Sequence, residues 1–268
     1  IAGPGGSRLY YKGLMDRLGI TAHIYRVGTF KSAVEPYLRG DQSPEAKQAD
    51  LAYAGVLWDK WLADVKAARP KAKLDAFIAD TPGAVRAASG DLGQASLSAG
   101  LVDKLGGRMA FGARVAEISG AADDSRPWDY NAIPLDNWVA ANPPAQKGRA
   151  IAVIPVAGEI VDGEASNGTA GGETIAGHIL DAASDGGVKA IVLRVDSPGG
   201  SVLASEQIRQ ALLAAKAKKL PIVVSMANVA ASGGYWISTP ADRIFAEPDT
   251  ITGSIGVFGI LPSFDQAL

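Results

Sequence analysis

A short apolar strand that runs into a serine and two glycines is the feature that most constrains this chain. Ile222–Met226 is an apolar run rich in β-branched residues and predicts a buried strand. A turn of small residues leads to Ser232, and Gly233 and Gly234 follow directly. From Ser232 onward the pattern predicts a helix. One hydroxyl would then stand at a helix N-terminus, where backbone N–H groups lack intrahelical partners.

Two interpretations of this turn are open on local grounds. The arrangement is analogous to the nucleophile elbow of hydrolases, although the G-x-S-x-G pattern is not met. An ordinary strand-to-helix turn in which Ser232 is the N-cap would have the same sequence.

Two further glycine-containing turns lie on either side of it. Ala190–Gly200 reads as a second buried strand that ends in Ser-Pro-Gly-Gly, and a helix is expected over residues 202–218. Paired glycines allow backbone N–H groups to face a ligand without an intervening Cβ. Downstream, Thr252–Gly256 reads Thr-Gly-Ser-Ile-Gly. Strands that alternate with helices at this spacing indicate βαβ units, and therefore an α/β fold.

Composition excludes several classes of chemistry. The 268 residues include no cysteine, which excludes disulfides, thiolate catalysis and cysteine-ligated zinc. The two histidines, His23 and His178, stand outside any metal-binding pattern, and nothing in the sequence brings either one to Ser232. The net charge of −2 does not favour nucleic acid as a partner. No apolar run approaches the roughly 18 residues that span a bilayer.

The three turn-containing segments, at residues 190–200, 222–234 and 252–256, together and in this order resemble the C-terminal half of bacterial signal peptide peptidase A in its long, two-half form. The matching stretch runs from residue 151 to about 259. The resemblance implies a serine–lysine protease of the Clp/crotonase-like ββα-repeat fold, built from two related halves that are both incomplete here. The chain would then be a fragment lacking both ends, and no metal or organic cofactor is expected.

The same resemblance implies a domain organisation. Residues 1–120 would be the C-terminal part of the first half, residues 149–268 the N-terminal part of the second, and the Asp-, Asn- and Pro-rich residues 121–148 a linker. Residues 6–18 and 256–268 share a spacing of glycine, apolar residues and aspartate, as two related halves would. In the first half, Ala22–Val27 predicts a short strand, and a helix is expected from Ser43–Pro44 to just before Pro70.

A serine hydroxyl needs a base to become a nucleophile, and lysine is the leading candidate in this chain. By composition alone Lys31 is an ordinary solvated loop lysine. The resemblance instead makes Lys31 the general base, Ser232 the acylating nucleophile and Ser254 the residue that orients the lysine amine. A lysine can act near neutral pH only where burial lowers its pKa. The apolar neighbours of Lys31 are consistent with such burial.

Four further residues receive roles by resemblance. The backbone N–H groups of Gly200 and Gly233 would form an oxyanion hole. Val202 and Leu203, which follow the paired glycines, are expected to line an apolar substrate pocket.

The expected function is therefore a serine endopeptidase that degrades cleaved signal peptides and other short apolar or unfolded segments. The resemblance implies a homotetramer on the periplasmic side of the bacterial inner membrane, with each Ser–Lys pair formed between neighbouring chains. Lys31 and Ser232 of one chain are accordingly expected to lie beyond hydrogen-bond reach of each other.

Two other functions fit the same segments. A crotonase-type acyl-CoA hydratase or lyase shares the fold and the paired amides, and CoA binding or thioester turnover would identify it. A catalytically silent, ring-forming scaffold would leave Ser232 unlabelled by a serine-reactive phosphonate.

Overall fold

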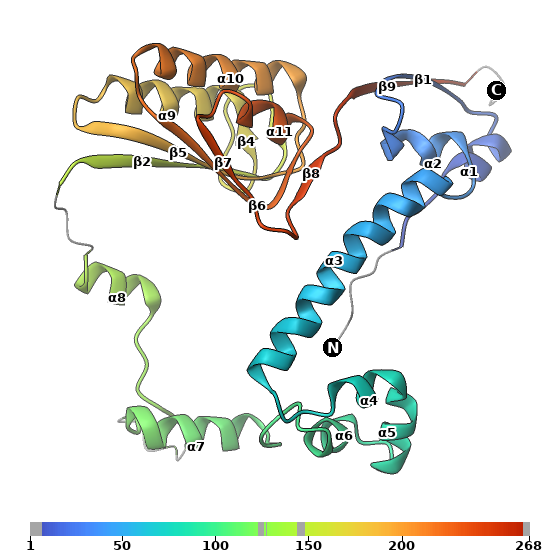
Figure 1. The fold of residues 1–268 in the computed structure, drawn as a ribbon, viewed down its shortest axis with the longest axis vertical. Helices are drawn as coiled ribbons and strands as arrows, with labels where there is room; N and C mark the ends of the chain where they lie inside the picture. The colour runs from blue at the N-terminus through green and yellow to red at the C-terminus, as the bar shows by residue number, and fades with distance from the viewer. Residues whose placement is uncertain (1–6, 123–125, 127, 144–147, 265–268) are drawn as a thin grey trace. The chain divides into compact units, whose positions relative to one another are not determined.

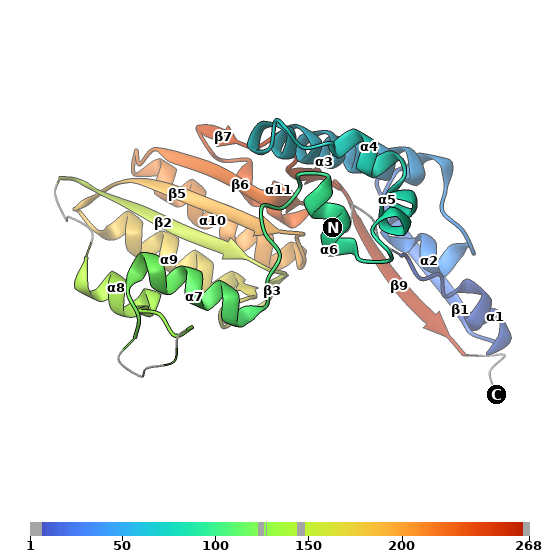
Figure 2. The same ribbon diagram turned by 90° about the horizontal axis from the view of Figure 1, so that it is seen from below.

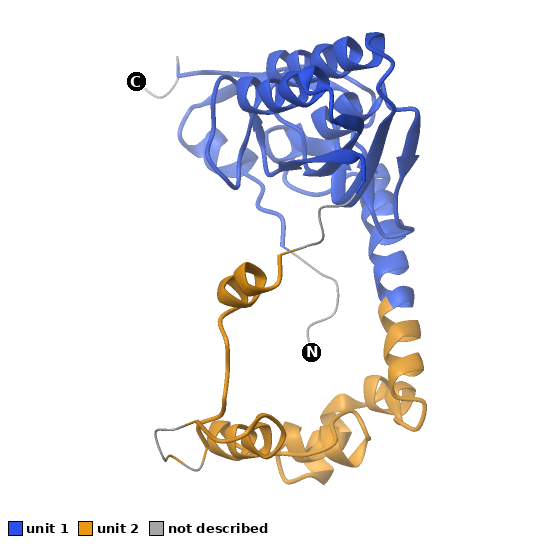
Figure 3. Cartoon of the chain, turned by 90° about the vertical axis from the view of Figure 1, so that its left-hand side faces the viewer, with its two compact units in different colours: residues 1–60, 148–268 blue, residues 61–147 orange. Residues whose placement is uncertain are grey.

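The computed structural model describes residues 7–122, 126, 128–143 and 148–264. The chain divides into two compact units, one made of residues 1–60 with 148–268 and the other of residues 61–147 (Figure 3). The first unit holds all the residues that sequence analysis singles out for chemistry.

A parallel sheet is the centre of the first unit, and it confirms the predicted α/β class. Its strands are β2 (Ala150–Ala157), β5 (Val188–Ser197), β6 (Ile222–Ala231), β7 (Arg243–Phe245) and β8 (Ile251–Gly253). They pair in the order β2-β5-β6-β7, with β8 paired to the later part of β6, and every pairing is parallel. The helices α9 (Gly172–Ser184) and α10 (Val202–Ala217) lie side by side on one face of this sheet (Figures 1 and 2).

The core lies between this face of the sheet and the two helices. On β5 every second side chain is fully buried (Ile191, Leu193 and Val195), as a strand with one covered face requires. Ile208 and Leu212 of α10 belong to the same buried cluster. Each fully buried side chain of this size contributes about 1.5–3 kcal/mol, so the core holds β5, β6 and α10 firmly. The carboxyl ends of β5 and β6, where the predicted turns lie, are thereby fixed.

The strand before Ser232 is longer than predicted. β6 continues beyond Met226 to Ala231 because its last residues pair with β8, with Ala231 opposite Gly253. The short helix α11 (Gly233–Ser238) follows after Ser232. A small parallel pair, β3 (Ile160–Val161) with β4 (Ala170–Gly171), lies beside the Ser-Pro-Gly-Gly turn, where Ile160 forms a bridge with Gly200.

A two-stranded ribbon joins the beginning of the chain to its far end. β1 (Thr21–Val27) pairs antiparallel with β9 (Val257–Ser263), in a register that runs from Thr21 opposite Ser263 to Val27 opposite Val257. Figures 1 and 2 both show these strands side by side. The strand predicted at residues 22–27 is confirmed, whereas the strand at 257–263 is not expected from sequence analysis.

Four helical segments complete the N-terminal part: α1 (Lys12–Arg17), the 3-10 turn η1 (Ser32–Val34), α2 (Glu35–Leu38) and α3 (Pro44–Ala68). The predicted start of α3 is confirmed, since the Ser43 hydroxyl accepts a hydrogen bond from the N–H of Ala46. In the described parts of the two segments with shared spacing, 7–18 and 256–264, the structures differ, because 12–17 is helix and 257–263 is strand.

The second unit is helical. Its elements are the end of α3, then α4 (Leu74–Ala79), α5 (Thr81–Ala87), α6 (Leu92–Ser98), α7 (Arg108–Ser119) and α8 (Leu135–Ala141). Leu74, Ala99 and Leu101 form a small buried cluster against which Trp61 packs. Among the helices of the described residues, none is both long and apolar enough to span a bilayer.

The compact units do not follow the linear halves expected from sequence. Residues 1–60 belong with residues 148–268, and the ribbon of β1 and β9 connects them. The linker at residues 121–148 between two related halves remains a prediction. Part of that stretch, including 123–125 and 144–147, lies outside the described residues.

Candidate active site

Ser232 occupies a strained turn between β6 and α11. Its backbone angles are φ 53° and ψ −117°, a region that side-chain-bearing residues rarely adopt and that costs roughly 1–3 kcal/mol. Hydrogen bonds on both sides hold it there. The Ser232 N–H donates to the carbonyl of Gly253 at 2.8 Å, and the N–H of Trp236 donates to the Ser232 carbonyl at 2.9 Å. The predicted strand–serine–helix turn is therefore present, with the hydroxyl at the helix N-terminus.

The Ser-Pro-Gly-Gly turn lies directly against Ser232. A Cβ built on Gly199 would stand 2.5 Å from the Gly233 nitrogen and 2.8 Å from the Ser232 Cβ, so only glycine fits there. A Cβ built on Gly233 would stand 3.3 Å from the Gly200 nitrogen. The structure thus brings the Gly200 and Gly233 backbones close together next to the serine, and the oxyanion hole formed by their N–H groups stays a prediction.

Lys31 lies beside both serines singled out from sequence. Its Nζ is 3.3 Å from Ser232 Oγ, 3.0 Å from Ser254 Oγ and 2.6 Å from the Ser254 carbonyl oxygen. Only 7% of Lys31 is exposed, and burial lowers the pKa of its amine. A buried lysine with a lowered pKa is a candidate base for the adjacent hydroxyl.

The contact between Lys31 and Ser232 corrects one prediction. Sequence analysis expects the two residues of one chain to lie beyond hydrogen-bond reach, with a neighbouring chain completing the pair. That expectation is wrong, because both side chains meet within a single chain. The physical reason is that the chain leaves the sheet after β8 and continues into β9, which pairs along its whole length with β1. Backbone hydrogen bonds therefore tie the lysine segment to the serine-bearing sheet.

Two glycines allow the lysine segment to cross the segment that carries Ser254. A Cβ on Gly256 would stand 2.2 Å from the Val27 carbonyl oxygen, and a Cβ on Gly28 would stand 2.8 Å from the Ile255 carbonyl oxygen. Both glycines also have positive φ angles, 135° and 108°. Just beyond this crossing, the N–H of Lys31 donates to the Gly28 carbonyl at 3.1 Å, which turns the chain towards Ser254.

Sequence reasoning assigns to Ser254 only a hydroxyl that orients the lysine, and the structure adds a second group. The Ser254 carbonyl oxygen forms the shorter of its two hydrogen bonds with Nζ. Ser254 has a positive φ of 50°, and this conformation accompanies the alignment of its carbonyl and hydroxyl on the same amine. The flanking glycines of Thr-Gly-Ser-Ile-Gly are the sequence signal for such an unusual backbone.

Comparison with known proteins assigns the chain to a family. Residues 1–121 and 214–268 match the model of peptidase family S49, which is about two thirds of the chain. The chain belongs to peptidase family S49. This S49 chain is 45% identical to Protease 4 of Salmonella typhi over 97% of its own length and 42% of that protein. It is 39% identical to Protease 4 of Haemophilus influenzae over 100% of its own length and 44% of that protein.

The S49 chain therefore spans less than half the length of these two curated relatives. Among solved structures it is similar to a ClpP1 variant from Listeria monocytogenes, with a TM-score of 0.27 and 20% identity over 37% of this chain and 50% of that one.

The predicted pocket residues of the S49 chain lie on its surface. Val202 and Leu203 form the first turn of α10, just after the paired glycines, and are 61% and 71% exposed. Their role in a substrate pocket stays a prediction.

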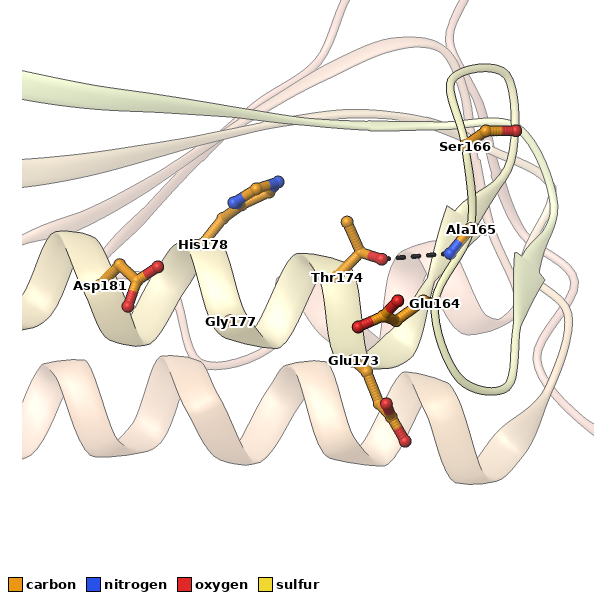
Figure 4. Close-up of a pocket in the computed structure, with 8 residues that line it drawn as sticks. All are labelled: Glu164, Ala165, Ser166, Glu173, Thr174, Gly177, His178 and Asp181. Carbon is orange, nitrogen blue, oxygen red and sulfur yellow. Dashed lines mark hydrogen bonds between the residues drawn. The ribbon is translucent and has the colours of Figure 1, made fainter.

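The two histidines lie elsewhere in the first unit. His178 lines a cavity of about 690 Å³ on α9, together with three carboxylates (Figure 4). His23 on β1 lies 3.2 Å from the Ser263 hydroxyl. The described part of this S49 chain holds no cluster of histidine and carboxylate side chains suited to a metal ion. Lysine, rather than histidine, is the titratable group beside the Ser232 hydroxyl.

A larger cavity, of about 1040 Å³, borders the lysine segment. Arg26, Phe30, Glu35 and Arg39 are among the residues that line it. Glu35 at its edge is buried and accepts hydrogen bonds from the hydroxyl and the N–H of Ser43. These bonds hold the segment between Lys31 and α3 in a fixed conformation.

Proposed function

We propose that this chain carries the catalytic pair of a serine endopeptidase, in which Ser232 is the nucleophile and Lys31 the general base. The observation that supports this most directly is the 3.3 Å approach of Lys31 Nζ to Ser232 Oγ at a strained strand-to-helix turn. Membership of peptidase family S49 supports the same reaction class.

The proposed reaction begins with Lys31 in its neutral form. The amine takes the proton of the Ser232 hydroxyl while Oγ attacks the carbonyl carbon of the scissile peptide bond. The resulting oxyanion is stabilised by the backbone N–H groups of Gly200 and Gly233. The Lys31 ammonium then returns its proton to the leaving amine, and an acyl-enzyme remains. Water, deprotonated by the same amine, hydrolyses the ester and restores Ser232.

Ser254 has a defined part in this cycle. Its carbonyl and hydroxyl oxygens lie 2.6 and 3.0 Å from Nζ, so both can accept hydrogen bonds from the ammonium that forms when Lys31 takes a proton from Ser232 or from water. A hydrogen bond from a charged donor is stronger than one from a neutral donor, so these two acceptors stabilise the short-lived ammonium. Burial acts in the opposite direction and keeps the resting amine partly neutral.

The substrates we propose are cleaved signal peptides and other short apolar or unfolded segments. Exposed apolar side chains that are close in sequence to the site residues, on Val202, Leu203, Phe30 and Ile255, are suited to such peptides. For the whole protein we propose a homotetramer on the periplasmic side of the bacterial inner membrane. The pairing of Lys31 with Ser232 within one chain means that oligomerisation is not needed to bring the base to the nucleophile.

Covalent labelling tests this proposal. A peptidyl phosphonate diphenyl ester should modify the wild-type chain stoichiometrically, with the adduct mapped to Ser232 by mass spectrometry. Ser232→Ala should abolish labelling, and Lys31→Met should slow it by at least about 10²-fold because the base is lost. The matched control is Lys104→Met, an exposed lysine of the second unit.

The same experiment distinguishes the alternatives. An unlabelled wild-type chain would overturn the peptidase assignment and favour a silent scaffold. Turnover of an acyl-CoA thioester would instead favour crotonase-type chemistry.

A further inference from the structure

A polar contact joins α10 to α11 behind the proposed catalytic serine. The carboxylate of Glu206 accepts a hydrogen bond from the indole Nε1 of Trp236 at 2.8 Å. Arg209 donates to both oxygens of the same carboxylate, at 2.8 Å each, and Gln210 donates to it at 2.6 Å. The Arg209 guanidinium also lies 5.5 Å from the centre of the Trp236 ring. Glu206, Arg209 and Trp236 thus restrain one another in position.

The positions of these residues along their helices give the contact its significance. Trp236 is four residues after Ser232, and its backbone N–H forms the first helical hydrogen bond of α11 with the Ser232 carbonyl. Glu206 is on α10, which begins two residues after Gly200. The backbones that carry the Gly200 and Gly233 amides therefore lead directly into the two helices that the Glu206–Trp236 contact joins.

We propose that Glu206 and Trp236 are positioning residues, which fix α11 against α10 and so set the spacing of the Gly200 and Gly233 amides around the Ser232 hydroxyl. This inference rests on the proposed peptidase function of the site.

Three physical arguments support it. A helix of six residues such as α11 has little stability of its own and depends on tertiary contacts. The strained backbone of Ser232 persists only where the surroundings over-determine it. An oxyanion hole acts through donors held in place before the reaction, so a small displacement of one amide lowers the rate.

The contact is also independent of the proton transfers at Lys31. Hydrogen bonds from Arg209, Gln210 and Trp236 lower the pKa of Glu206 to about 2. The carboxylate therefore stays ionised over the whole range in which a lysine amine titrates, and the two effects can be measured separately.

The test compares Trp236→Phe and Glu206→Ala with Glu206→Gln in the full chain. Phenylalanine keeps the ring but removes the indole donor, alanine removes the acceptor, and glutamine keeps an oxygen that can accept from Nε1. We expect Trp236→Phe and Glu206→Ala to slow phosphonate labelling of Ser232 at least about tenfold. Glu206→Gln should retain most of the wild-type rate.

A matched control and two further measurements separate positioning from a general structural role. Glu117→Ala removes a surface Arg–Glu pair of similar helical spacing in the second unit and should leave labelling unchanged. With a peptide substrate, kcat should fall while KM stays unchanged. The affinity for a peptide aldehyde, whose adduct carries an oxyanion, should fall by the same factor as kcat.

The outcomes are distinct. If the wild type labels and Trp236→Phe and Glu206→Ala label at the same rate, the positioning role is overturned and the proposed function stands. If the wild type does not label at Ser232, both are overturned. Trp236 is half exposed, and near-ultraviolet circular dichroism verifies that each variant is folded. If Glu206→Ala fails to fold, Trp236→Phe and Glu206→Gln decide the question.

Discussion

Lys31 Nζ and Ser232 Oγ lie 3.3 Å apart although 201 positions separate the two residues in the chain. This distance predicts the result of a mixing experiment. Co-assembled Ser232→Ala and Lys31→Ala chains should show no recovered peptidase activity, because neither chain has a complete pair. Activity is measured on mixed oligomers isolated through two different affinity tags.

The control for the mixing experiment is the co-assembly of wild-type and Ser232→Ala chains, which should keep activity in proportion to its wild-type content. Activity in the mixture of Ser232→Ala and Lys31→Ala chains that is well above the activity of either variant alone would contradict this prediction. It would mean that Lys31 of one chain serves Ser232 of another.

The pKa of Lys31 predicts how activity depends on pH. Burial lowers the pKa of this amine from its ordinary value, so the neutral base becomes available below the pH at which an exposed lysine titrates. The rate of phosphonate labelling should therefore rise with pH, with a midpoint below pH ~10.4, the pKa of an unperturbed lysine. A profile centred near pH ~6.5, typical of histidine, and retained in Lys31→Met would contradict the assignment.

The same lowered pKa has a consequence for stability. Between the folded and unfolded pKa values of Lys31 the unfolded chain binds more protons, so the free energy of unfolding should rise with pH through that window. Lys31→Met removes this dependence and should unfold at a higher urea concentration than the wild type at neutral pH. Urea titrations of both proteins at pH 7 and pH 10 measure the difference. If the free energy of unfolding of the wild type fell between pH 7 and pH 10 relative to that of Lys31→Met, the predicted direction would be wrong.

The close approach at Gly256 predicts that the position of Lys31 is sensitive to an added side chain at this crossing. In Gly256→Ala the added Cβ would meet the Val27 carbonyl oxygen at 2.2 Å, at a φ of 135° that alanine adopts only under strain. We expect a loss of about 1–3 kcal/mol of stability and a fall in labelling by at least tenfold, as Lys31 moves away from Ser232. Thermal unfolding and labelling rates measure the two effects.

Gly259 is the matched control for that substitution. It lies on the same strand, β9, and a Cβ built there meets nothing within 4 Å. Gly259→Ala should label at close to the wild-type rate, and equal losses in both variants would indicate that β9 is sensitive along its whole length.

The two hydrogen bonds of the Ser43 hydroxyl predict that this residue contributes to the stability of the fold. Its hydroxyl donates to the buried Glu35 carboxylate and accepts from the N–H of Ala46 at the start of α3. Ser43→Ala removes the helix cap and leaves one Glu35 oxygen without this donor, which should cost about 1–2 kcal/mol. Chemical denaturation measures it. Ser98→Ala is the control, because that exposed serine donates to the Gln94 carbonyl of its own helix; a similar cost there would contradict the role of Ser43.

The parts of the fold that could be predicted from sequence are those set by neighbours in the chain. The turn at Ser232 is such a case, because β-branched residues, then small residues, then paired glycines specify strand, close packing and helix start within a few positions. The cap at Ser43 is another. The parallel arrangement of β5 and β6 follows from strands that alternate with helices.

The parts that could not be predicted depend on contacts between distant segments. The spacing of residues 256–268 is similar to that of residues 6–18, yet β9 is a strand because β1 offers it a partner. The close crossing of Gly256 with Val27 has no local signal beyond two glycines, which are common in turns. The expectation of a pair formed between chains was wrong for the same reason. Without knowledge of the β1–β9 ribbon, nothing in the sequence places Lys31 next to Ser232 of the same chain.

The pairing of β1 with β9 also sets a time order during synthesis on the ribosome. Lys31 and β1 are made before the sheet that carries Ser232, and this sheet can fold before β9 has been made. The hydrogen bonds between β1 and β9, which hold the lysine segment to the sheet that carries Ser232, form only after β9 has been made. If Ser232 and Lys31 act as proposed, the nascent polypeptide cannot attack peptide bonds, its own included, before β9 has been translated.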